Sequence, residues 1–403
     1  MEEKVFGLPA GLLANSMIVI LVAISIILLF GGLRRFILVK MGTRNIPRRK
    51  GQSTLIVMGL MLSSIIVAVS LGIGDTVRYS VRSVVFDSAG NIDEVISGPG
   101  KQLFGVEYFS YSEFEEVERL ASTNSNIDGI MPYIEINLPV ENVKSEIAES
   151  RVQVRGYSSK YSDSFDQIKN INDELVSINT LSTDQVYINT ALRDTLNLNK
   201  GDVVGVYINL EKKEFEVMDV LESGSIAGAN ITPTISFEIS NLQKLLDKEN
   251  MITNIAISNS GNQDESLELS DDVTQFLRLN LTNKQVANKF FEILSSNEIP
   301  TLIKEEAKSL EQTDSETFEE LTRIASDLEG DNFNEEFITS VGDYQLQLII
   351  LGALDKAGLQ AEAAQLLMMF GDLTTLRVDD SKNNGVKLAE TVASGVTLSL
   401  IHI

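Results

Sequence analysis

Two long apolar runs flank a short basic segment at the start of this chain of 403 residues. No residue between Lys4 and Arg34 is charged, and a second uncharged run extends from Gly51 to Gly74. As helices, runs of this length span the roughly 30 Å hydrocarbon core of a bilayer. We therefore predict a first transmembrane helix within residues 1–33 and a second one that begins at residue 51.

The segment between the two runs, residues 34–50, carries only positive charge. Its charged residues are Arg34, Arg35, Lys40, Arg44, Arg48, Arg49 and Lys50. Short basic loops stay on the cytoplasmic side of a membrane, so we expect the N-terminus and the region after the second helix to lie outside. Apolar residues alternate with these charges at near-helical spacing, which is typical of a helix in the membrane interface. In the simpler alternative, the charges only fix the topology.

The order of the charges argues against a signal peptide. A signal peptide carries its positive charges before the apolar core, whereas here Glu2 and Glu3 precede the run and Arg34 and Arg35 follow it. We therefore expect both helices to be retained.

Charge is divided unevenly along the chain. Residues 1–74 carry eight Lys or Arg and two Glu, a net charge of +6, so the rest of the chain must carry −30 to give the total of −24. Nucleic-acid binding requires clustered Lys and Arg, whereas an external region this acidic repels nucleic acid. We therefore expect no nucleic-acid partner.

Several kinds of chemistry are excluded by what the sequence lacks. There is no cysteine, and the single histidine is His402. Histidine-based triads, histidine-ligated metals and cysteine nucleophiles are therefore unavailable, and no G-x-x-x-x-G-K-[ST] segment provides a P-loop. We expect no catalytic, cofactor-binding or metal-binding residues and no enzymatic activity in this chain.

The second apolar run changes gradually into an amphipathic helix. Valines recur at helical spacing beyond Gly74, which predicts that the membrane helix continues outward as a stalk to about Phe86. Asp75, Arg78 and Val81 are the expected stalk residues. Residues 51–86 are thus the predicted second transmembrane helix and stalk.

Residues 87–282 have the pattern of an α+β domain with a strand-rich insert at about 181–235. The expected strands lie at 134–140, 152–155, 185–188, 203–208, 215–220, 235–239 and 252–257. A short helix is expected at Thr190–Leu196, and two further helices begin at Ser112 and Ser240. Ser112 with Glu115 has the spacing of a capping box, as has Ser240 with Gln243. The strands at 235–239 and 252–257 are predicted to form a compact β-α-β unit, and residues 223–229 a flexible connection.

Residues 283–386 have a helical pattern and form a predicted insertion. Thr313 and Glu316 have capping-box spacing, and Gly330 is placed to end the helix that they begin. The segments 344–356 and 359–370 are strongly apolar but too short to span a bilayer. We expect buried core helices, or alternatively a surface that docks a partner. Residues 387–403 read as the start of a truncated helix.

The segment from Met41 to Val77 carries a specific motif. It reads Met-Gly-Thr-Arg-Asn-Ile-Pro-Arg-Arg-Lys-Gly from Met41 to Gly51, then Gln52-x-Thr54-Leu55 and Gly59. This segment resembles the entry to FtsX/MacB-type ABC transporter permeases. In that family an interfacial basic helix ending in R-N-x-x-R-R-K leads into a membrane helix, a stalk and an external domain. The similar order of elements covers about residues 34–280.

The chain departs from the family pattern in three ways. The helix at 8–33 precedes the usual start, and the helical block at 283–370 has no counterpart. The later membrane helices, with the cytoplasmic coupling helix, are missing, and truncation near residue 398 would explain this. The expected fold is a membrane protein with two N-terminal transmembrane helices and a large α+β extracytoplasmic domain with a helical insertion.

The resemblance implies a multi-pass permease subunit in the cell membrane. Its implied partners are a cytoplasmic ABC ATPase subunit, membrane lipids, and a second permease copy in a homodimer or a paired permease. The ATPase would move the membrane helices, and the stalk would pass the motion to the external domain. This motion would export a lipid, lipoprotein or amphiphile, or control an external partner.

Two other classes of protein fit the same two-helix layout. A sensory receptor would need a signalling domain inside the cell, and an adhesion or scaffold ectodomain would need no ATPase. The sequence beyond residue 398 distinguishes them, because three further membrane helices indicate the permease.

Overall fold

A computed structural model provides the structure of this chain. It describes residues 4–5, 8–34, 37, 40–41, 50–99, 106–162, 165, 167–229, 231–296, 298–311, 314–374, 376–380 and 382–387. The chain divides into two compact units. Unit 1 comprises Met1–Val84 with Gly385–Ile403, and unit 2 comprises Val85–Asn384.

Two long helices dominate unit 1. Helix α1 (Ala10–Arg34) follows a short antiparallel pair, β1 (Lys4–Val5) and β2 (Leu8–Pro9), and helix α3 (Lys50–Ala89) is continuous over 40 residues. Where side chains are described, most large apolar ones on both helices are exposed: Ile18, Val19, Ile20, Leu21, Ile24, Ile26 and Phe30 on α1, and Leu55, Ile56, Val57, Met58, Leu60, Met61, Leu62, Ile65, Ile66 and Val69 on α3. Contiguous apolar surface of this kind marks an interaction with a membrane or a protein.

The length and hydropathy of the described helices set a limit on membrane spans. Among helical residues whose placement is described throughout, no single helix is both long and apolar enough to cross a bilayer. Helices α13 (Glu335–Val341) and α14 (Tyr344–Lys356), bent by 81° at their junction, satisfy length and composition only as a pair. The two N-terminal transmembrane helices therefore stay a prediction.

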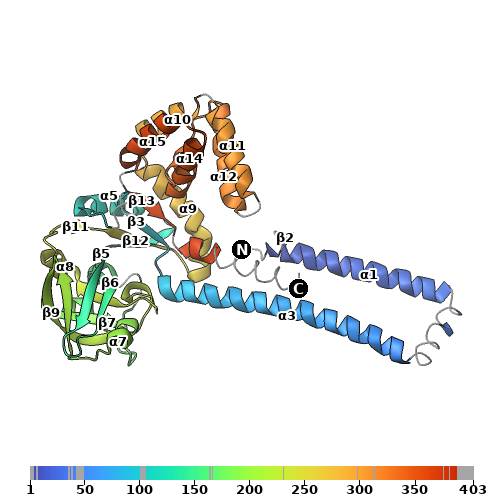
Figure 1. The fold of residues 1–403 in the computed structure, drawn as a ribbon, viewed down its shortest axis with the longest axis horizontal. Helices are drawn as coiled ribbons and strands as arrows, with labels where there is room; N and C mark the ends of the chain where they lie inside the picture. The colour runs from blue at the N-terminus through green and yellow to red at the C-terminus, as the bar shows by residue number, and fades with distance from the viewer. Residues whose placement is uncertain are drawn as a thin grey trace. The chain divides into compact units, whose positions relative to one another are not determined.

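A nine-stranded sheet forms the centre of unit 2 (Figure 1). Its order is β13-β3-β12-β5-β6-β10-β7-β9-β8. The strands are β3 (Glu94–Ser97), β5 (Ile127–Asn142), β6 (Ala148–Tyr157), β7 (Gln185–Asn189), β8 (Val203–Ile208), β9 (Glu211–Leu221), β10 (Thr234–Glu238), β12 (Asn254–Asn259) and β13 (Arg377–Asp379). A further pair, β4 (Phe109–Ser110) with β11 (Met251–Ile252), is antiparallel.

The long strand β5 belongs to both halves of this sheet. Its first half pairs with β12, while its last residues pair with β8 at Val140–Val206. This second pairing closes β5, β6, β10, β7, β9 and β8 into a ring. Valine, isoleucine and leucine side chains fill the ring, and Phe215 meets Phe237 edge to face with ring centroids 5.0 Å apart. The ring is the strand-rich region expected at about 181–235, extended by β5 and β6.

Helices cover the half of the sheet that contains β3 and β12. They are α5 (Tyr111–Ala121) and α9 (Gln263–Leu281), and both contribute to one core with Ile96, Ile255 and Ile257. The shorter helical elements are α6 (Ser159–Ser162), η2 (Ile178–Thr180), α7 (Thr190–Leu196), η3 (Ser225–Ala227) and α8 (Ile239–Leu245). Helix α9 was not expected from the sequence.

The structure corrects the predicted helix caps. Ser110, rather than Ser112, caps α5 by accepting a hydrogen bond from the Ser112 amide, since the pairing of β4 holds Ser110 in an extended conformation. Glu238, rather than Ser240, caps α8 and accepts from the amides of Ser240 and Asn241. Asp314 caps the helix attributed to Thr313, which lies outside the described residues.

The expected compact β-α-β unit is also wrong. Strands β10 and β12 flank helix α8 in sequence, but β5 and β6 separate them in the sheet. Strand β10 pairs with β6 and β7 instead. The reason is that β5 and β6 form a long antiparallel pair. Strand β12 pairs with the other edge of β5, and strand β10 pairs with the other edge of β6.

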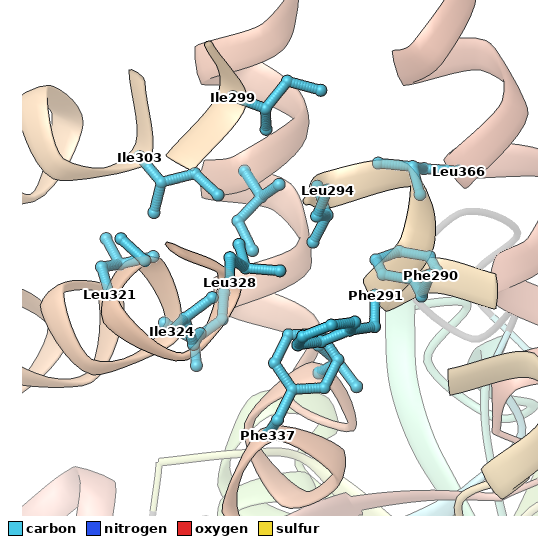
Figure 2. Close-up of a cluster of buried hydrophobic side chains, with 14 of the residues drawn as sticks. Phe290, Phe291, Leu294, Ile299, Ile303, Leu321, Ile324, Leu328, Phe337 and Leu366 are labelled. Atoms are coloured by element: carbon cyan, nitrogen blue, oxygen red, sulfur yellow. The ribbon is translucent and has the colours of Figure 1, made fainter. Parts of the chain in front are cut away.

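Six helices between α9 and β13 form a separate core (Figure 2). They are α10 (Lys284–Leu294), α11 (Ile299–Leu310), α12 (Ser315–Glu329), α13, α14 and α15 (Gln360–Leu373). Phe291 and Phe337 meet edge to face with centroids 4.9 Å apart. Helices α14 and α15 bury Ile350 and Leu366 in this core, which confirms the expected core helices.

After α15 the chain returns to the sheet. Strand β13 pairs with β3 through Val378 and Ile96, at the edge of the sheet. These residues lie within the segment 283–386 that was predicted to be helical, so the strand differs from the prediction. The beginning and the end of unit 2 therefore lie on adjacent strands.

Candidate functional site

The site residues predicted from the sequence lie mainly in unit 1. Arg34 is the last residue of α1, Lys50 is the first of α3, and both are exposed, as is Lys40. Arg35, Arg44, Arg48 and Arg49 lie outside the described residues. The stalk residues Asp75, Arg78 and Val81 are part of the continuous helix α3. The roles of all ten residues stay predictions.

The structure adds a buried polar cluster that the sequence did not indicate. It lies where the end of α3 leads into β3 and where the chain leaves β13. We call it the buried polar network, and it comprises Asp93, Glu94, Asn259, Ser266, Ser270, Asp380, Lys382 and Asn383, all 6% exposed or less. Unsatisfied polar groups are costly inside a protein, so the partners of these groups determine the local structure.

An ion pair between Asp93 and Lys382 is the centre of the network. The two residues are 289 positions apart in sequence, and each is 1% exposed. Lys382 Nζ lies 2.8 Å from Asp93 Oδ1 and 5.3 Å from the centroid of the Phe86 ring, on the last turns of α3. The second Asp93 oxygen accepts the Asn259 amide at 2.8 Å. One lysine thus joins the entry and the exit of unit 2.

The neighbouring carboxyl group of Glu94 is fully buried. Its Oε1 atom accepts hydrogen bonds from Ser270 Oγ at 2.7 Å and from Asn259 Nδ2 at 2.9 Å. Burial raises the pKa of Glu94 to about 8, and the hydrogen bonds from Asn259 and Ser270 offset only part of this effect. Glu94 is therefore mainly neutral at pH 7, which limits the negative charge beside Asp93.

Asp380 connects the network to the segment after β13. Its Oδ1 atom accepts from the Asn383 amide at 3.2 Å and lies 3.2 Å from Ser270 Oγ. Its Oδ2 atom accepts from Asn383 Nδ2 at 2.8 Å. Residues 382–387 are helical, so Asp380 holds the first turn of this exit helix against α9.

On another side of α3, the loop at 223–229 packs against its last turn. Arg155 Nη1 donates to the carbonyl oxygens of Ser225 and Ile226 at 2.7 and 3.1 Å, and both residues are buried. Gly224 has a φ of 140°, and a Cβ there would lie 3.0 Å from the Asp87 carbonyl oxygen. The predicted flexible connection is therefore wrong, because Arg155 fixes the loop from inside. A cavity of about 240 Å³ lies between this loop and the end of α3.

The groups of the buried polar network bind one another and so attach several chain segments to each other. Within the described ranges, no group of three or more His, Cys, Asp or Glu residues is arranged to hold a metal ion. The network instead ties three elements, α3, α9 and the exit helix, to one end of β3. Sequence reasoning missed it because its members are short polar residues scattered from residue 93 to residue 383, with no shared spacing.

The sequence comparison identifies the family. Residues 53–274 match the MacB-like periplasmic core domain, which is more than half of the chain. A comparison with curated proteins finds no match.

Solved structures that match part of this chain are distant in sequence. The periplasmic region of MacB from Actinobacillus actinomycetemcomitans is 14% identical with a TM-score of 0.33, over 48% of this chain and 86% of that one. The extracellular domain of the noncanonic ABC-type transporter YknZ from Gram-positive bacteria is 14% identical with a TM-score of 0.29, over 44% and 92%. A domain of a permease protein from Porphyromonas gingivalis is 11% identical with a TM-score of 0.28, over 50% and 87%.

The family assignment rests on the match over residues 53–274, which begins at the start of α3 and ends within α9. It covers the helix that enters unit 2, the closed ring and most of the sheet, and it agrees with the resemblance carried by residues 41–77. The chain belongs to the FtsX/MacB-like ABC transporter permease family, through its MacB-like periplasmic core domain.

Proposed function

We propose that this chain is a permease subunit that passes motion from the membrane to its external domain. In this proposal α1 and the first part of α3 cross the cell membrane, and the basic segment at 34–50 lies in the cytoplasmic interface. A separate cytoplasmic ABC ATPase moves these helices, and two permease copies pair. The moved cargo is a lipid, lipoprotein or amphiphile, or the motion controls an external partner.

The observation that supports this proposal is the Asp93–Lys382 ion pair. A force along α3 arrives at Phe86 and Asp93, and Lys382 contacts both. The same lysine lies in the exit helix, so the two chain connections of unit 2 would move together. A sheet held by only one connection would instead rotate about it.

The buried position of the pair makes this attachment stiff. Removing one partner of a buried ion pair leaves an uncompensated charge and costs about 3–5 kcal/mol. The motion would therefore be passed on as rotation or displacement of the whole sheet.

The test uses the full chain co-expressed with a cytoplasmic ABC ATPase of the same transporter family. Hydrogen–deuterium exchange is measured with and without a non-hydrolysable ATP analogue. We expect the nucleotide to change the exchange of β3 and β13 amides in the wild type. The variant Lys382→Met should still bind the ATPase but lose this response, and Lys382→Arg should keep part of it.

Lys304→Met is the matched control, because Lys304 forms an exposed ion pair with Glu329 on the helical segment. Exposed pairs contribute about 0–1 kcal/mol, so the response of β3 should not change. An unchanged response in Lys382→Met would overturn the proposed attachment. A chain that binds no P-loop ATPase would overturn the permease role and favour the receptor or adhesion alternatives.

A further inference from the structure

A second cavity of about 250 Å³ lies between the helical core and the edge of the sheet, away from the buried polar network. Helix α14 contributes Tyr344 and Gln347 to its wall, and α15 contributes Leu367, Phe370 and Gly371. Strand β13 contributes Arg377. Leu367 is half exposed, so the apolar wall of this cavity continues to the protein surface.

Arg377 lines this cavity, and among the described residues its guanidinium group has no hydrogen-bonding partner. The residue is 8% exposed, and its guanidinium carbon lies 4.4 Å from the centroid of the Tyr344 ring. Within the part of the chain that the structure describes, its side-chain N–H groups form no hydrogen bond or ion pair. Stacking satisfies one face of a guanidinium but none of its five N–H donors.

The charges around Arg377 do not replace such a partner. Asp343 forms an ion pair with Arg278 Nη2 at 2.7 Å. Asp379 lies two residues along β13 and attracts the guanidinium only from a distance, and burial is the main effect that lowers the pKa of Arg377. The N–H donors of Arg377 are open to the cavity, and a ligand carboxylate matches their fork.

The other lining residues restrict the charge of that ligand. Glu107 contributes a carboxylate to the cavity, and its side chain lies against Gly98. One cation and one carboxylate give the cavity no net positive charge, so a polyanion such as a nucleotide is disfavoured. The walls from Tyr344, Leu367 and Phe370 are apolar and aromatic, which suits a hydrocarbon body.

We propose that this cavity binds a small monocarboxylate with an apolar body, such as a medium-chain fatty acid. Arg377 holds the carboxylate, and the apolar chain lies along Leu367 and Phe370 toward the surface. Binding needs only this chain, so it is independent of the ATPase and of the transport role. Either proposal can fail without the other.

The test measures binding of radiolabelled decanoate by equilibrium dialysis to the full chain in phosphatidylcholine nanodiscs, with empty nanodiscs subtracted. We expect one saturable site in the wild type, and at least tenfold weaker binding in Arg377→Met. Decanol, which has the same chain but no charge, should bind at least tenfold more weakly than decanoate. Vesicles containing phosphatidylglycerol should not compete if the ligand is a free monocarboxylate rather than a lipid headgroup.

A second variant fills the cavity without removing a charge. A Cβ at Gly371 meets no atom within 4 Å, so Gly371→Leu should fit and place its side chain in the cavity. Replacing a helical glycine by leucine stabilises a helix by up to about 1 kcal/mol, so this variant should fold. We expect it to lose decanoate binding at least tenfold.

Gly352→Leu is the matched control, because Gly352 also has free space around its Cβ, lies on α14 and does not line the cavity. Its decanoate affinity should equal that of the wild type. The proposal is overturned if decanol binds as tightly as decanoate, if Gly371→Leu retains wild-type affinity, or if Gly352→Leu loses as much affinity as Gly371→Leu.

Discussion

At the scale of single residues, the buried polar network contains more acidic than basic groups. It holds three carboxyl groups, those of Asp93, Glu94 and Asp380, but one ammonium group, that of Lys382, which pairs with Asp93. Three ionised carboxylates at this depth would repel each other, and the raised pKa of Glu94 removes one of the charges. Its protonation is therefore part of the folded state.

This protonation makes the stability of the chain depend on pH. The folded pKa of Glu94 is about 8, above the usual 4.5, so between these values the folded state holds a proton that the unfolded state has lost. Stability must then fall as pH rises toward 8, by up to about 1.4 kcal/mol per pH unit for one such group. Glu94→Gln removes this term, so its stability relative to the wild type should increase with pH.

Urea unfolding of the full chain between pH 5.5 and pH 9 measures this difference. Glu211→Gln is the control, because Glu211 lies exposed at the start of β9 and its replacement should not alter the pH profile. Parallel pH profiles for the wild type and Glu94→Gln would show that Glu94 is ionised in the folded protein.

At the scale of the elements, the six helices after α9 have their own core, separate from that of the sheet. Phe337 is fully buried there and contacts Phe291 and Phe333. Phe337→Ala should cost about 3–5 kcal/mol through lost burial and the remaining cavity. Hydrogen exchange should increase in α10–α15, while the ring of strands keeps its protection.

Met368→Ala is the matched control, because Met368 is 82% exposed on α15 and its loss should change stability by no more than about 0.5 kcal/mol. An equal loss of protection in the ring and in the helices would show that the two cores unfold as one.

Elements with a strong local signal could be predicted from the sequence. Helix α7 begins and ends where expected, since Asn189 caps it and Leu192 and Leu196 form its buried face. Helix α9 was missed because its buried face includes Ser266, Ser270 and Thr274, which do not produce an apolar period.

Other features depend on contacts between distant parts of the chain. Strand β13 has only three residues and follows an apolar helix, so its pairing with β3 has no local signal. The partners in the buried polar network are up to 289 residues apart, and the cavity around Arg377 forms only when α14 and α15 pack near β13. Spacing along the sequence cannot reveal such groups.

At the scale of the whole molecule, the uneven charge gives a test of the predicted topology. The basic segment at 34–50 should face the cytoplasm, and the acidic remainder should lie outside. Because the chain has no cysteine, one introduced cysteine reports one position. In intact cells, a membrane-impermeant maleimide should label Ser145→Cys, which is exposed in a turn of unit 2, and should not label Thr43→Cys in the basic segment.

Permeabilised cells provide the control, since both variants should then be labelled. Labelling of Thr43→Cys but not Ser145→Cys in intact cells would reverse the topology and place the sheet on the ATPase side. Equal labelling of both would mean that the two positions are not separated by a membrane. In either case α3 could not carry motion from a cytoplasmic ATPase to Asp93. The predicted labelling pattern instead places the start of α3 on the cytoplasmic side and Asp93 outside, so that α3 connects the ATPase side with the sheet.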